Sequence, residues 1–133
     1  RFTPCWPDMM HANMVDLLTS LPGKPRHDYP EGLPFASAFA HGSMQLELYA
    51  PGSNADGRDR QTPHTQDELY LVMRGTSRFM LEGLRRDVKA GDALFVPAHA
   101  EHRFEEFSAD FATWVVFYGP SGGEKFTLTG ETL

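Results

Sequence analysis

The chain of 133 residues has little of several features that mark particular classes of protein. Its single cysteine, Cys5, allows no disulfide within the chain, which fits a reducing compartment such as the cytoplasm. No apolar stretch approaches membrane-spanning length, and nothing resembles a signal peptide. A net charge of −6, with no basic run beyond Arg85-Arg86, argues against nucleic acid or an anionic membrane as a partner. Glycine-rich phosphate loops, serine elbows and zinc-finger spacings are also missing.

What is present is the composition of one globular domain, with 41% hydrophobic and 23% charged residues. Residues 8–20 predict a helix that Asp8 caps and Pro22-Gly23 ends. Its apolar stripe is formed by Met10, Met14, Leu17, Leu18 and Leu21. We expect this stripe to pack on the rest of the domain or on a second subunit, in preference to another partner. Residues 22–34, which are rich in proline, predict a connector without regular structure.

From residue 35 onward, short apolar runs between turn residues predict an antiparallel β-structure, with turn glycines at 75, 83 and 91. The expected strands are 35–40, 44–49, 69–73, 76–81, 84–89, 93–96, 102–107 and 111–118. Gln45, Glu47 and Tyr49 alternate with apolar residues and share one face of their strand. Glu47 and Tyr49 face either a pocket or solvent, and we favour the pocket. The loop 51–60 is expected at the entrance of that pocket.

The segment from Thr62 to Gly75 carries the most specific chemistry, because it places a histidine and a carboxylate four residues apart before an apolar run. On a straight strand the Cα atoms of His64 and Glu68 would lie about 13 Å apart, too far to share one ion. The polar residues 65–67 tolerate a turn, so we expect a bend there that lets the two side chains converge. Tyr70 then shares the face of Glu68.

This segment and a second one resemble the two sequence motifs of the cupin superfamily. In the first motif His64, Glu68 and Gly75 match, and Thr62 stands where the family has another histidine. In the second motif the matching residues are Gly91, Pro97 and His102, while His99 replaces a glycine and Glu106 an asparagine. With strand-like flanks the resemblance extends over residues 35–118. The sequence of the two motifs is similar to that of small single-domain bacterial cupins.

The resemblance implies an all-β fold, a double-stranded β-helix (cupin or jelly-roll barrel) with a short N-terminal helix. It divides the chain into the helix and connector at 1–34, the barrel at 35–120 and a C-terminal tail at 121–133. The expected assembly is a homodimer, and the expected partner is a small-molecule ligand, with no nucleic acid and no membrane.

The resemblance also implies one divalent metal ion, held by His64, Glu68 and His102. Two histidines and one carboxylate form the ligand set of non-haem Fe(II) oxygenases, and they also suit Mn, Ni, Co or Zn. Gln61 is a candidate for a further oxygen ligand, as are Thr62 and Asp59, although Gln61 needs a local distortion to reach the ion. The alternative is a barrel whose histidines only form hydrogen bonds.

Three residues near these motifs are candidates for proton transfer: Tyr70, Glu106 and His99. The alternatives are that Tyr70 only packs, that Glu106 only makes a hydrogen bond, and that His99 only occupies a turn, which we favour. Our leading hypothesis is a metal-dependent oxygenase acting on a small polar or aromatic molecule. The others are an isomerase or lyase that uses the same metal, and a binding or sensing module without chemistry.

Overall fold

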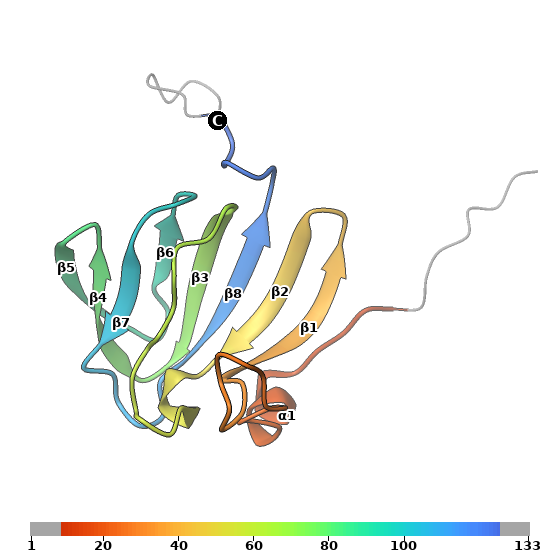
Figure 1. Cartoon of the computed structure of the whole chain (residues 1–133), viewed down its shortest axis with the longest axis vertical. Coiled ribbons are helices and arrows are strands. Elements are labelled where there is room, and N and C mark those ends of the chain that lie inside the picture. Colours follow the sequence, from red (N-terminus) through yellow and green to blue (C-terminus); the bar gives the residue numbers. More distant parts are fainter. Residues whose placement is uncertain (1–8, 126–133) are drawn as a thin grey trace, which may run out of the picture.

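The computed structural model describes residues 9–125, which fold into two facing antiparallel sheets with one short helix at their end (Figure 1). Cys5, the Asp8 cap and the end of the tail lie outside the described residues. The elements are α1 Met14–Thr19, β1 Phe35–His41, β2 Met44–Tyr49, the 3-10 turn η1 Pro51–Ser53, β3 Asp67–Arg74, β4 Thr76–Leu81, β5 Leu84–Lys89, β6 Ala93–Val96, β7 His102–Glu105 and β8 Ala112–Tyr118. The predicted all-β jelly-roll fold is confirmed.

The larger sheet has the strand order β1-β2-β8-β3-β6, and the smaller sheet has the order β5-β4-β7. The last strand, β8, lies between β2 and β3, so residues far apart in the sequence become neighbours. The two sheets meet through aromatic side chains. Tyr70 of β3 has its ring centroid 4.8 Å from that of Phe104 in β7 and 6.0 Å from that of Phe79 in β4.

Strand β3 shows how the alternation of side chains builds this core. Glu68, Tyr70 and Val72 are buried between the sheets, whereas Leu71 and Met73 are exposed on the outer face. This is the period of two that an extended strand imposes on its side chains. The prediction that Tyr70 shares the face of Glu68 is confirmed.

The helix is shorter than the sequence predicted, because it begins at Met14 instead of near residue 8. Asn13 is its N-cap, and the side chain of this residue accepts hydrogen bonds from the backbone N–H groups of Val15 and Asp16. An asparagine in an extended conformation is a strong helix start, so the residues before it stay outside the helix. As expected, α1 packs on the domain, where it contacts β1 and β2. The connector 22–34 has only an isolated β-bridge.

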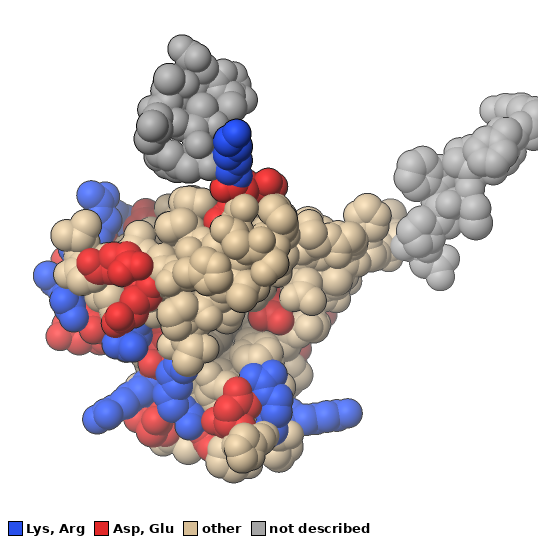
Figure 2. Space-filling model, turned by 45° about the horizontal axis from the view of Figure 1, so that its top comes forward, with Lys and Arg blue, Asp and Glu red and all other residues tan. Residues whose placement is uncertain are grey.

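Charged residues of both signs are intermixed on the face shown in Figure 2, where they gather along the lower and left margins. No uniformly basic area is visible on this face. Within residues 9–125, no helix is both long enough and apolar enough to span a bilayer.

Candidate metal centre

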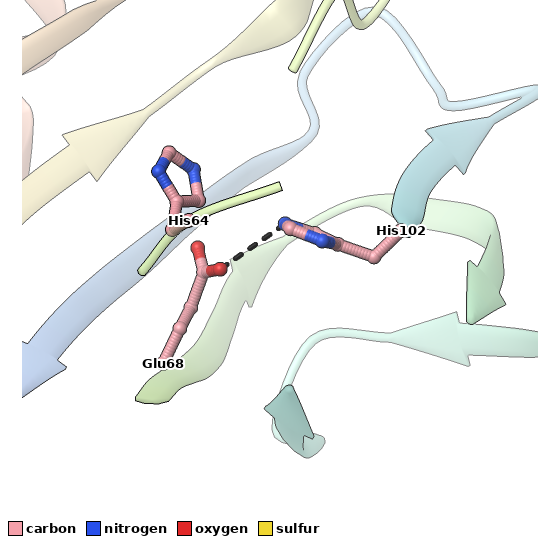
Figure 3. Close-up of side chains that lie close together, drawn as sticks. All are labelled: His64, Glu68 and His102. Carbon is pink, nitrogen blue, oxygen red and sulfur yellow. Dashed lines mark ion pairs between the residues drawn. The ribbon is translucent and has the colours of Figure 1, made fainter. Parts of the chain in front are cut away.

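Three side chains from separate segments converge at one end of the space between the sheets (Figure 3). His64 comes from the loop before β3, Glu68 from β3 itself, and His102 from the first position of β7. One potential ligand atom from each residue lies within 4.8 Å of the others. Glu68 and His102 are buried and His64 is half-buried. The predicted bend at residues 65–66 is present, and it brings His64 to Glu68.

The loop that carries His64 is fastened on two sides. The Gln66 side-chain amide donates to the carbonyl oxygens of Ser43, at 3.0 Å, and Gly119, at 2.9 Å. The backbone N–H of His99 donates to the carbonyl of His64 at 2.7 Å. These bonds fix the backbone of a ligand that no strand holds, which supports a defined position for its imidazole.

The donor atoms of the three residues fit a divalent cation. Nε2 of His64, both carboxylate oxygens of Glu68 and Nε2 of His102 are buried without a hydrogen-bond partner in the described part of the chain. Nε2 of His102 lies 3.1 Å from Oε1 of Glu68, but the contact lacks hydrogen-bond geometry. Nδ1 of His102 lies 2.9 Å from the carbonyl of Ala100, which directs the lone pair of Nε2 at the centre of the group. Burying polar atoms without partners costs folding free energy, and one bound cation would be a partner for all of these atoms.

Burial and charge act on the two histidines in opposite directions. Burial lowers the pKa of His64 and outweighs the negative charge of Glu68. Burial also lowers the pKa of His102, but there the adjacent Glu68 carboxylate outweighs it and the net pKa is raised. Without a cation, Glu68 therefore favours a proton on His102. A metal ligand must give up that proton, so acid competes with metal at this residue.

The hydroxyl of Tyr70 lies beside the three residues and is held by the side chain of Gln61. It donates to Oε1 of Gln61 at 2.8 Å. Burial raises the pKa of Tyr70 well above its usual range, and the negative charge of Glu68 raises it further. The amide oxygen of Gln61, predicted as a metal ligand, therefore accepts from Tyr70, and Thr62 is exposed.

The orientation of Gln61 is set by Asp59, a buried carboxylate that accepts four hydrogen bonds. Its Oδ1 accepts from the Tyr49 hydroxyl at 2.5 Å and from the Gln61 backbone at 3.0 Å. Its Oδ2 accepts from the Gln61 amide at 2.9 Å and from the Phe104 backbone at 2.8 Å. Because Asp59 can only accept when ionised, the Gln61 amide must present its NH₂ to Asp59 and its oxygen to Tyr70. Sequence reasoning considered Asp59 and Gln61 only as oxygen ligands and missed this network.

Two predicted proton-transfer residues lie away from the site. Glu106 was expected to share the inward face of His102, and this is wrong, because β7 ends at Glu105 and Glu106 has a left-handed φ of 46°. Its side chain is exposed. His99 is exposed in a turn with a φ of 69°, which agrees with the reading that it serves the turn. Of the three candidates, only Tyr70 is brought to the three convergent residues.

A pocket of about 410 Å³ opens above His64. Glu47 and Tyr49 line it, so the predicted pocket face of β2 is confirmed. Arg60 lines it as well, at the end of the loop that was expected at the entrance. The other lining residues are Arg26, Asp28, Tyr29, Phe35, Gln45, Gln61, Thr62, Thr65, Gln66, Val115 and Phe117.

Comparisons with known proteins agree with this fold. The family described as "Cupin domain" matches residues 45–118. An uncharacterized protein of Streptomyces coelicolor is 36% identical over 78 residues, covering 59% of this chain and 72% of that protein. The dimethylsulfoniopropionate lyase DddW of Ruegeria pomeroyi is 25% identical over 111 residues, covering 71% and 73%. The structure of TT1209 from Thermus thermophilus is similar in fold, with a TM-score of 0.55, 18% identity and coverage of 83% and 97%.

Proposed function

The chain belongs to the cupin family, and from this premise we propose that it is a metal-dependent lyase acting on a small carboxylate. The observation that carries the proposal is the group of His64, Glu68 and His102, whose donor atoms lack partners and whose His64 lines an open pocket. Tyr70 adds a proton-transfer group beside it. The similarity to a dimethylsulfoniopropionate lyase supports a lyase over the oxygenase that the sequence favoured.

When bound, a divalent cation supplies positive charge that can hold substrate carboxylate oxygens and offset the charge of Glu68. Offsetting the charge of Glu68 removes one of the causes that raise the pKa of Tyr70, and burial, the largest cause, remains. Because Tyr70 donates to Gln61, that bond leaves the lone pairs of the fully buried Tyr70 oxygen unused.

The reaction assigned to Tyr70 is a β-elimination. Tyr70 first gives the proton that it shares with Gln61 to water in the pocket. The C–H bond next to the substrate carboxylate then breaks, and its proton passes to the Tyr70 oxygen. The electron pair of that bond forms the C=C double bond, and the leaving group departs with the electrons of its own bond. Asp59 and Gln61 position the Tyr70 hydroxyl before it loses its proton.

The first test is metal content, measured by elemental analysis of untagged protein purified without chelators. We expect about one equivalent of metal per chain, and its loss in Glu68→Ala and His102→Ala. Little metal in the wild type, even after reconstitution with Fe(II), Mn(II), Ni(II), Co(II) or Zn(II), would overturn the proposal.

The second test concerns the chemistry. On small carboxylates with a β leaving group, Tyr70→Phe should keep its metal and lose turnover and solvent deuterium exchange at the carbon next to the carboxylate.

An oxygenase is the second candidate, because two histidines and one carboxylate suit Fe(II) and O₂. Substrate-dependent oxygen uptake by the Fe(II) protein would favour it. Saturable binding without either reaction would identify a binding module.

A further inference from the structure

Glu47 lines the pocket from β2, in the same sheet as β3, which carries Glu68. Its register partner on β8 is Val115, and the partner of Val115 on β3 is Tyr70. Glu47 and Tyr70 thus share one row of the inner face, about 10 Å apart at their Cα atoms, which is two strand spacings. A small linear molecule could contact Glu47 with one end and reach the metal centre with the other.

The charges around the pocket compensate Glu47 only weakly, because Arg26 acts on it from beyond ion-pair distance. Arg26 forms two bonds with Asp28, at 2.6 and 2.7 Å, and Arg60 is paired with Glu31. Both arginines on the pocket wall are therefore already paired with other carboxylates. Within residues 9–125, no Lys, Arg or His lies within ion-pair distance of Glu47. Its weakly compensated charge favours a cation in the pocket and disfavours a second anionic group.

Aromatic rings complete a wall that suits a cation. Phe35 and Phe117 line the pocket together with Tyr49 on the strand of Glu47. The Arg26 guanidinium lies 5.4 Å from the Phe35 ring centroid and already occupies that contact, so Tyr49 and Phe117 are the rings left for a ligand. Aromatic faces attract ammonium and similar cations, more strongly when water is excluded.

From this placement we propose that Glu47 and its aromatic neighbours bind a positively charged group of the substrate, an ammonium, quaternary ammonium or sulfonium centre. The carboxylate at the other end of the same molecule would reach the metal centre, so the inference rests on the proposed function. Burial, and then the charge of Glu68, raise the pKa of Glu47. A cation beside this carboxylate would relieve that unfavourable environment.

The test compares two ligands of the same shape that differ by one charge. One is the trimethylammonio-propanoate zwitterion, and the other is its carbon isostere, an anion in which an uncharged tert-butyl group replaces the trimethylammonio group. Binding to metal-loaded protein is measured by isothermal titration calorimetry. The wild type should prefer the zwitterion by about tenfold, and Glu47→Gln should lose that preference. Asp87→Asn removes a charge from an exposed pair on the far sheet and should keep it.

Equal binding of both ligands by the wild type would overturn the inference, as would an unchanged preference in Glu47→Gln that is folded by circular dichroism. Failure of both ligands to bind would overturn it too. A preference that depends on Glu47, in a protein without lyase turnover, would support the cation site and reject the proposed reaction. The two proposals therefore fail separately.

Discussion

Replacing Asp59 should destabilise the whole protein as well as the site. The residue is 5% exposed and accepts hydrogen bonds from Tyr49, Phe104 and twice from Gln61. Two of these four donors are backbone N–H groups, which cannot turn toward another acceptor. The test variants are Asp59→Asn and Asp59→Ala.

The magnitude for Asp59→Asn follows from where its NH₂ group would lie. At the Oδ1 position it meets the Tyr49 hydroxyl, which can turn and accept, and the Gln61 N–H, which cannot. At the Oδ2 position it meets the Phe104 N–H and disturbs the Gln61 amide that holds Tyr70. Either orientation leaves at least one buried N–H unpaired, at about 2 kcal/mol. Asp59→Ala removes the acceptor for all four donors and should cost about 4 kcal/mol.

Urea unfolding measures both changes, with the exposed Asp87→Asn as the matched control. Asp87 pairs with Arg78 at the surface, so its replacement should change stability by less than about 1 kcal/mol. A loss below about 0.5 kcal/mol for Asp59→Asn, with an unchanged m value, would refute the reasoning. Combining Asp59→Asn with Tyr49→Phe should cost less than the sum of the single changes, because the two residues share a hydrogen bond.

Four further predictions concern the metal, a turn, pH and assembly. A divalent metal at a hundredfold excess over its Kd should stabilise the wild type by about 2.7 kcal/mol in a thermal scan, and His102→Ala should lose this gain. Gly75 has a φ of +75°, and an added Cβ would lie 2.9 Å from the Cα of Phe111, so Gly75→Ala should destabilise by more than about 2 kcal/mol. Gly83→Ala is its control, because φ is +81° but nothing lies within 4 Å of the added Cβ; it should cost about 1 kcal/mol. Because folding raises the pKa of Glu47, its contribution to stability is greatest below the unfolded pKa and falls as the pH rises through the folded pKa. At pH 7, the metal-free Glu47→Gln variant should therefore unfold at a higher urea concentration than the metal-free wild type. This difference in urea midpoint should become smaller at acidic pH, and an equal difference at pH 7 and at acidic pH would contradict the prediction. Sedimentation velocity should give twice the mass of the chain, as expected for a homodimer, and the mass of one chain would reject that expectation.

The strands were largely predictable because their signals are local. The strands β2, β4, β5 and β6 have the bounds that alternating side chains and turn residues indicated. The convergence of His64 and Glu68 was also local, because it needed only a bend between residues four apart. The resemblance supplied His102, which no spacing rule would have brought to the other two.

The remaining features depend on contacts that no local pattern records. Asp59 is joined to Phe104, 45 residues away, and nothing in its sequence neighbourhood indicates burial. The sequence alternation predicts Glu106 on the same strand face as His102. Glu106 itself has a left-handed φ, and this ends the alternation. The helix begins at Met14 because the Asn13 side chain caps it there.

The position of β8 has a consequence for how the protein is made. Strands β2 and β3 are both hydrogen-bonded to β8, so neither has its full set of neighbours until residues 112–118 have left the ribosome. At roughly 5–20 residues per second, β2 waits several seconds for its partner. Glu68 lies on β3 and has the same dependence, so a complete ligand set should exist only after nearly all of the described chain has been synthesised. Metal loading in the cell is therefore expected to follow translation, and the exposed edges of β2 and β3 are the segments most in need of protection before then.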